Sequence, residues 1–199
     1  GRKIGIRTGE ASEYGTFQDL MEGYRKQLEY FIDVKIRGNR VIERLWAERL
    51  PAPFLSILID GCAQSGKDYN DGGAEYNTSY IQGVGFGTLV DSFAALRKHL
   101  YLDGSIEMSG LKEALDSNFE GDEEMRNRLA RMSPKYGNDD MDADDLIAPL
   151  FEMFFDAVDG KPNTRGGEHR INLLPTTCHI YFGKMTGATP DGRFSGKPF

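Results

Sequence analysis

The chain has few cysteines, one tryptophan and no long hydrophobic run. Only Cys62 and Cys178 occur among its 199 residues, and they lie far apart in the sequence. Neither a disulfide framework nor a paired-cysteine metal site is therefore predicted. No apolar run approaches the roughly 20 residues of a membrane-spanning helix, and no hydrophobic signal region follows the first residues. We expect a protein that works in the reducing cytoplasm without membrane contact.

Positive charge is also scarce. The formal net charge is −7, and residues 103–160 hold 16 Asp and Glu against 5 Lys and Arg. Residues 161–199 reverse the balance, with 2 acids against 6 bases. A nucleic-acid partner is not expected, because phosphate binding needs a basic face. The acidic segment is interpreted as solvated helical faces.

The remaining composition, with 39% hydrophobic and 28% charged residues, is enough for a sizeable core, and we treat the chain as one unit. Apolar periodicity predicts a long helix over residues 16–50, with Thr16 as its N-cap and Pro51 after its end. Gly38 and Asn39 leave open a kink or two abutting helices. Further helices are predicted over residues 88–100, 109–119, 123–132 and 140–158.

Two apolar segments have the features of strands. Residues 54–59 form a short apolar run bounded by prolines, which indicates a strand or a short buried segment. Residues 174–183 are rich in β-branched and aromatic side chains, begin near a proline, and lead to the turn sequence Pro-Asp-Gly at 190–192. The second segment is the more informative one, because it also carries polar groups.

Alternation along a strand at 174–183 would divide those polar groups between two faces. Thr177 and His179 would share one face, and Thr176 and Cys178 the other. Cys178 and His179 would then point apart, so they could not form a nucleophile pair. Buried threonines and histidines are most often simply hydrogen-bonded, which is the simpler interpretation here.

Other motifs favour structural interpretations. Residues 83–87 are glycine-rich, but their third glycine is misplaced for a dinucleotide-binding loop, so close backbone packing at a helix start is preferred. Residues 61–67 are not a phosphate-binding loop, because Asp68 stands where that motif needs serine or threonine. Cys62 is interpreted as a small apolar filler, and residues 139–145 as an acidic helix start rather than a calcium loop. No cofactor-binding or metal site is therefore expected in this chain.

Six motifs occur together in one order: PAPFLS at 51–56, GGAEYN at 72–77, GVG at 83–85, PKYGNDD at 134–140, LPTTCH at 174–179 and GATPDGR at 187–193. This order resembles that of the glycyl radical enzyme superfamily, which includes pyruvate formate-lyase. The resemblance covers essentially the whole chain. The later motifs look most like the branch of trans-4-hydroxyproline dehydratase and the second pyruvate formate-lyases.

The resemblance implies an α/β fold. The chain would be a helix-rich segment of the ten-stranded glycyl radical enzyme barrel, contributing helices and a few barrel strands. Family members carry their radical chemistry on a cysteine loop and a glycine loop, and no matching motif for either loop occurs in this sequence. Residues 1–199 are therefore expected to be an internal fragment of the pyruvate formate-lyase-like barrel domain, lacking both loops and inactive alone.

The resemblance also implies a function for the parent enzyme. A dehydratase such as hydroxyproline dehydratase would act on a small polar metabolite by thiyl-radical hydrogen abstraction. The alternatives are a pyruvate formate-lyase, which cleaves a carbon–carbon bond and transfers the acyl group to coenzyme A, and a non-catalytic helical interaction module.

The partners implied are the rest of the parent chain, a radical-S-adenosylmethionine activase that installs the glycyl radical, a small-molecule substrate and a second copy in a homodimer. No catalytic residue is expected in this segment. Thr176, Thr177 and His179 are candidates for the substrate pocket, with Thr176 and His179 as competing choices on opposite faces.

Overall fold

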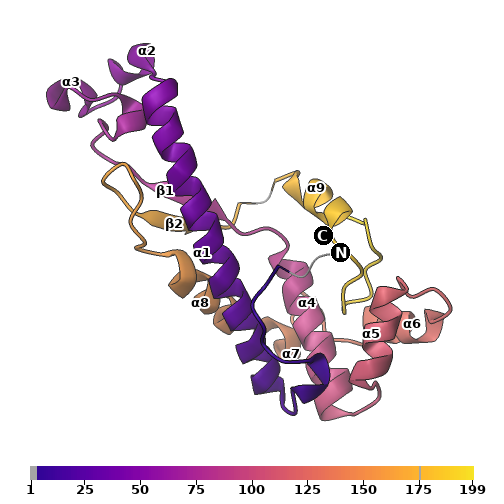
Figure 1. Cartoon of the computed structure of the whole chain (residues 1–199). Coiled ribbons are helices and arrows are strands. Elements are labelled where there is room, and N and C mark those ends of the chain that lie inside the picture. The colour runs from indigo at the N-terminus through magenta and orange to yellow at the C-terminus, as the bar shows by residue number, and fades with distance from the viewer. Residues whose placement is uncertain (1–3, 175) are drawn as a thin grey trace. The chain divides into compact units, whose positions relative to one another are not determined.

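The computed structural model describes residues 4–174 and 176–199, and it is helix-rich with one small sheet (Figure 1). By its internal contacts the chain divides into two compact units. Unit 1 comprises residues 4–6, Lys26–Gln82 and Met153–Asn172, and unit 2 comprises Arg7–Arg25, Gly83–Glu152 and Leu173–Phe199. In the described part of the chain, no helix is both long and apolar enough to cross a membrane.

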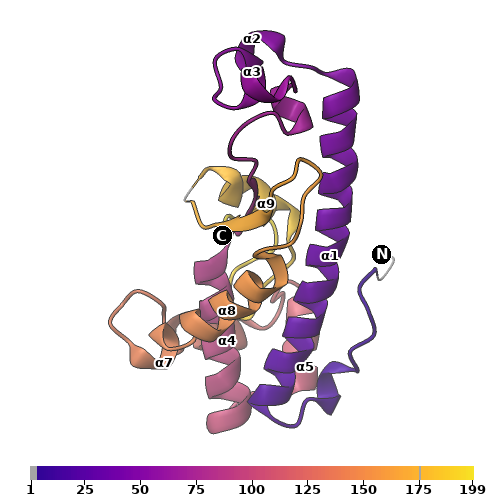
Figure 2. The same ribbon diagram turned by 90° about the vertical axis from the view of Figure 1, so that its left-hand side faces the viewer.

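The longest element is α1, Phe17–Arg49, a continuous helix of 33 residues (Figure 2). It begins with a capping box: the backbone N–H of Asp19 donates to Thr16 Oγ1 at 3.1 Å, and the backbone N–H of Thr16 donates to Asp19 Oδ2 at 3.0 Å. It ends before Pro51, since proline disfavours helical geometry in the residue that precedes it. The helix predicted over 16–50 is confirmed, and Gly38 does not interrupt it.

Unit 1 contains the sheet, in which β1 (Ser79–Gln82) and β2 (His169–Asn172) run parallel. Their register pairs Ser79 with His169 and Gln82 with Asn172. Ser79 and Ile81 are buried in β1, as alternation along a strand requires. Neither strand was among the predicted elements.

The strand predicted over residues 54–59 is wrong. The chain there forms the short helix α2, Pro53–Ser56, in which Pro53 occupies the first turn, where its fixed φ favours a helix. The apolar side chains of this segment remain exposed, with Phe54 at 84% and Leu58 at 79% of their maximal exposure. The preference of Pro53 for the first turn of a helix therefore outweighs the strand propensity of the apolar run.

The polar segment after α2 contains α3, Cys62–Ser65, and the 3₁₀ turn η2, Tyr69–Asp71. Cys62 is buried, which agrees with its interpretation as an apolar filler.

Unit 2 is built around α4, Phe86–Leu96, which runs directly into the π-helical segment η3, Arg97–Leu102. The other elements of this unit are η1 (Ala11–Glu13), α5 (Met108–Asp116), α6 (Glu123–Arg131), α7 (Met141–Asp144) and α9 (Cys178–Met185). Its core cluster consists of Ala95, Ile106, Leu111, Ala114, Phe119 and Leu129. The helices predicted over 88–100, 109–119 and 123–132 are confirmed with small shifts of their ends.

The helix predicted over 140–158 is two helices, α7 and α8 (Ile147–Val158). Asp140 caps α7, because its side chain accepts a hydrogen bond from the backbone N–H of Asp142 at 3.1 Å. The acidic segment is thus a helix start, as predicted.

The strand predicted over 174–183 is also wrong, since this segment contains α9. Pro175, near which the strand was expected to begin, lies outside the described residues. Gly183 explains part of the difference: it is buried, and a Cβ atom there would lie 2.2 Å from the carbonyl oxygen of Lys197. A helix can lie against the following loop at this position only because the residue is glycine. Close tertiary packing overrides the strand propensity of residues 180–182.

Candidate functional site

A hollow of about 670 Å³ lies in unit 2. It is lined by residues 83–88, which follow β1 in the chain, by residues of the segment 173–179, which follows β2, and by Phe199. Thr176, Thr177 and His179 all border it. The structure thus brings the three predicted pocket residues together. Thr176 and His179 are not competing choices on opposite faces, because the chain turns into a helix at this point.

Hydrogen bonds at the start of α9 fix these side chains. The Nδ1 atom of His179 lies 2.6 Å from the carbonyl oxygen of Thr176. Because a carbonyl oxygen can only accept, Nδ1 is the donor of this bond, and in the tautomer that has its single proton on Nδ1 the other ring nitrogen, Nε2, is an acceptor. The hydroxyl oxygen of Thr176 accepts from the backbone N–H of Cys178 at 3.3 Å. One turn of chain therefore presents a threonine hydroxyl and an imidazole acceptor together.

The two cysteines lie away from this group. Cys178 is exposed and does not line the hollow, and adjacent residues of a helix do not face each other, so Cys178 and His179 form no nucleophile pair. Cys62 is buried in unit 1. No thiol takes part in the candidate site.

Glycines form the opposite side of the hollow. Gly85 caps α4 with a φ of 86°, a conformation that favours glycine, and a Cβ atom there would lie 3.0 Å from the ring of Phe199. A Cβ atom on Gly83 would lie 2.7 Å from the side chains of Leu173 and Phe86. Close packing at a helix start, as predicted for residues 83–87, is confirmed. Because Gly83 and Gly85 have no side chains, the backbone at the start of α4 lines the hollow directly at these positions.

The C-terminal loop supplies Phe199, which the sequence did not single out. Arg193 organises this loop: its guanidinium donates to the carbonyl oxygens of Gly187 and Lys197, both at 2.6 Å, and its Cζ lies 4.8 Å from the centre of the Phe199 ring. The backbone N–H of Phe199 lies 3.4 Å from the carbonyl oxygen of His179. The GATPDGR motif was the available signal for Arg193, whereas no sequence signal marked Phe199.

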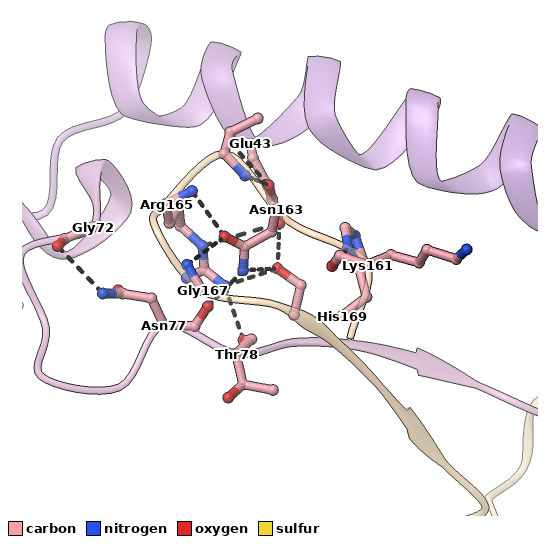
Figure 3. A network of polar contacts seen from close by, with 11 residues as sticks. Glu43, Gly72, Asn77, Thr78, Lys161, Asn163, Arg165, Gly167 and His169 are labelled. Atoms are coloured by element: carbon pink, nitrogen blue, oxygen red, sulfur yellow. Dashed lines mark hydrogen bonds and ion pairs between the residues drawn. The ribbon is translucent and has the colours of Figure 1, made fainter. Parts of the chain in front are cut away.

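A second polar cluster lies in unit 1, around Glu43 of α1 (Figure 3). The carboxylate of Glu43 accepts from the backbone N–H and the hydroxyl of Thr164, at 3.0 and 2.8 Å, and from the hydroxyl of Ser79. Arg165 Nε lies 4.0 Å from the same carboxylate. Burial alone raises the pKa of Glu43, but the hydrogen bonds from Ser79 and Thr164 and the charge of Arg165 together lower it below its usual value. Glu43 is therefore ionised and well satisfied.

Asn163 completes this cluster from the loop before β2. Its Oδ1 accepts from the backbone N–H groups of Arg165 and Gly167, both at 2.9 Å, and its Nδ2 donates to the carbonyl oxygen of Asn77 at 2.5 Å (Figure 3). Arg165 also donates to the carbonyl oxygen of Thr78 at 2.9 Å. The cluster fastens a loop to β1 and to α1, which is a structural role. Among residues 4–174 and 176–199, no three metal-ligating side chains gather at one place.

The family is shown by comparison with known proteins. Residues 1–183 match the family model described as pyruvate formate lyase-like. The chain is 47% identical over 197 residues to a trans-4-hydroxy-L-proline dehydratase from Clostridioides difficile, covering 99% of this chain and 25% of that protein. A crystal structure of the hydroxyproline dehydratase from Clostridioides difficile, with trans-4-hydroxy-L-proline bound, superposes with a TM-score of 0.93 over 98% of this chain and 25% of that one.

Two further solved structures of glycyl radical enzymes and dehydratases are also similar to this chain. The B12-independent glycerol dehydratase from Clostridium butyricum is 39% identical, with a TM-score of 0.94 over 100% of this chain and 25% of that one. A glycyl radical enzyme from Archaeoglobus fulgidus is 36% identical, with a TM-score of 0.86 over 92% of this chain and 23% of that one. The chain spans about a quarter of the length of these relatives. It belongs to the pyruvate formate lyase-like family of glycyl radical enzymes.

Proposed function

We propose that this chain forms part of the substrate-pocket wall of a larger glycyl radical dehydratase. One observation carries the proposal: the hydroxyls of Thr176 and Thr177 and the imidazole of His179 border one hollow. The similarity to dehydratases over nearly the whole chain supports dehydration as the reaction. It gives no support to carbon–carbon cleavage with acyl transfer to coenzyme A, or to a non-catalytic module.

The residues present do not fit the radical centres themselves. The sequence carries neither a cysteine-tip motif nor a glycine-loop motif, so radical transfer is assigned to the rest of the enzyme. The chemistry supplied there would be removal of a hydrogen atom from a substrate carbon, loss of water from the resulting radical, and return of the hydrogen atom to the product radical. Residues 1–199 would belong to the barrel domain of a cytoplasmic homodimer, which a radical-S-adenosylmethionine activase converts to its radical form.

The contribution of this chain is binding and orientation. His179 Nε2 can accept a hydrogen bond from a substrate hydroxyl or ammonium group, while a threonine hydroxyl can donate to a carboxylate or hydroxyl oxygen. The aromatic rings of Phe86 and Phe199 line the same hollow and give it an apolar wall. Polar groups fixed against an apolar wall hold a small polar substrate in one orientation, which decides the carbon that loses hydrogen.

The test uses the full-length enzyme that contains this segment, activated to its radical form, with trans-4-hydroxy-L-proline and glycerol as substrates. Thr176→Val and His179→Gln each remove one hydrogen-bonding group, so we expect kcat/KM to fall about 10- to 100-fold, as for an unpaired polar group in a binding site. The yield of glycyl radical, measured by electron paramagnetic resonance, should not change, because these residues do not store the radical.

Thr186→Val is the matched control. Its hydroxyl donates to the carbonyl oxygen of Phe182 at 2.8 Å, and it does not line the hollow. This variant should retain the kcat/KM of the unaltered enzyme. Full activity in both Thr176→Val and His179→Gln would remove the hollow as the substrate site.

A further inference from the structure

We propose that Lys135 is a positioning residue that holds Phe199 in place as a wall of the hollow, without lining the hollow itself. This inference rests on the proposed function of the hollow. Lys135 belongs to the segment between α6 and α7, and its side chain joins α4 to the C-terminal loop that carries Phe199. All residues involved lie in unit 2.

The first step is the attachment of Lys135 to α4. Asp91 of α4 accepts a hydrogen bond from the backbone N–H of Tyr136 at 2.8 Å, and its other carboxylate oxygen lies 3.5 Å from Lys135 Nζ. The side chains of Lys135 and Asp91 are only 25% and 22% exposed. One carboxylate thus holds both the backbone and the side chain of this segment, which makes it a fixed attachment rather than a mobile surface pair.

The second step leads from Lys135 to the C-terminal loop. Lys135 Nζ donates to the carbonyl oxygen of Asp191 at 3.3 Å. The carboxylate of Asp191 in turn accepts from the hydroxyl of Thr189 at 2.5 Å and lies 3.4 Å from the backbone nitrogen of Arg193. The ammonium group of Lys135 therefore reaches the backbone of the turn from which Arg193 projects.

The third step leads from Arg193 to the hollow. Arg193 binds the carbonyl oxygen of Lys197 and stacks over Phe199, whose ring lies opposite Gly85. Gly85 and Asp91 are the N-cap and a mid-helix residue of the same helix, α4. Because a helix is rigid, a loop fastened at Asp91 places Phe199 at a set distance from Gly85. Phe199 thus lies against Gly85, and its position as a wall of the hollow depends on the Lys135 attachment.

The test compares Lys135→Met, which keeps the length of the side chain but removes its charge, with Lys135→Arg, which keeps the charge. In the activated full-length enzyme, with trans-4-hydroxy-L-proline and glycerol as substrates, we expect Lys135→Met to raise KM about 10-fold. The change in kcat should be smaller, about 2-fold, because the loop orients substrate rather than reacting with it. Lys135→Arg should restore most of the KM.

Hydrogen–deuterium exchange gives a second readout that is independent of the substrate. In Lys135→Met the backbone amides of residues 187–199 should exchange at least about 5-fold faster, because their attachment to α4 is lost. Asp91→Asn should give the same pattern, and the double variant should add little to either single change.

Lys112→Met is the matched control. Lys112 pairs with Asp116 at 2.5 Å within one helix, and both side chains are mostly exposed, at 64% and 69%. This variant should change neither KM nor the exchange of residues 187–199.

The outcomes separate this inference from the proposed function. An unchanged KM and unchanged exchange in Lys135→Met, together with loss of activity in Thr176→Val and His179→Gln, would overturn the role of Lys135 and leave the site in place. Unchanged kinetics in all of these variants would overturn both. A uniform loss of stability, with faster exchange throughout unit 2, would also count against a specific positioning role.

Discussion

The cluster around Glu43 and the hollow beside His179 use the same kinds of side chains in opposite ways. Around Glu43, most hydroxyl, amide and guanidinium groups bind one another and the backbone, and two atoms without a hydrogen-bond partner among the described residues, Asn77 Oδ1 and Arg165 Nε, are buried. Beside His179, a hydroxyl and an imidazole nitrogen border about 670 Å³ of open space. A gathering of polar residues therefore indicates a site only where the groups retain unused hydrogen-bonding capacity next to a cavity.

The largest expected loss of stability comes from a substitution that disrupts the Glu43 cluster. Glu43→Ala leaves the hydroxyls of Ser79 and Thr164 without their shared acceptor and Arg165 without its neighbouring carboxylate, and we expect the free energy of unfolding to fall by about 3 kcal/mol, as for the loss of one partner of a charged pair shielded from solvent. Urea denaturation of the full-length enzyme that contains this segment, followed by circular dichroism, measures this as a shift of the unfolding midpoint. Thr176→Val at the hollow should cost less, about 0.5–1 kcal/mol, because it removes one hydrogen bond, from the backbone N–H of Cys178 at 3.3 Å. Equal costs at the two sites would contradict the distinction between them.

A smaller effect is expected at the wall of the hollow. Gly85→Ala places a side chain at a φ of 86° and against the ring of Phe199, so we expect a loss of about 1–2 kcal/mol. Gly87→Ala is the matched control, because no atom lies within 4 Å of its added Cβ and it sits inside α4. That variant should be neutral or more stable, by up to about 1 kcal/mol. Thermal unfolding of both variants tests the close approach of Gly85 and Phe199, which similar melting temperatures would disprove.

The smallest expected effect is a pH dependence of stability. The pKa of Glu43 is lower in the folded chain than its ordinary value of 4.5, so the folded state binds fewer protons. The stability that Glu43 contributes is then present above about pH 4.5 and is lost as the pH falls through the lower folded pKa. Glu43→Gln should flatten the fall in unfolding free energy between about pH 5 and 3 relative to the unaltered chain. His179→Gln is the control and should leave the slope of unfolding free energy against pH unchanged. Parallel curves of unfolding free energy against pH for Glu43→Gln and the unaltered chain would argue against an ionised Glu43.

Local signals predicted the helices well. The capping box at Thr16, the apolar period of α1 and the acidic start of α7 are short-range features, and each produced the expected element. The strand prediction for residues 174–183 was wrong, because the packing of Gly183 against Lys197 outweighed the strand propensity of this segment. β1 and β2 were missed, since each has four residues and the partners lie about 90 positions apart in the sequence.

The candidate site was only partly predictable, because part of it also depends on contacts between residues that lie far apart in the sequence. Thr176, Thr177 and His179 could be chosen from their side-chain chemistry and from the family resemblance. The remaining wall depends on contacts between distant segments, such as Gly85 with Phe199. Nothing in the sequence near Phe199 marks that contact, because a phenylalanine there has no local pattern to distinguish it.

The small parallel sheet has a consequence for the chain in isolation. Within the described residues, β1 and β2 pair with each other alone, so the outer edge of each strand presents N–H and C=O groups with no neighbouring strand. Parallel sheets are usually covered on both faces, and two short strands are too few to be stable alone. In a protein about four times longer, further strands can extend this sheet on both sides. A preparation of these 199 residues alone would instead recruit strands from its own copies, and its solubility would depend on blocking those two edges.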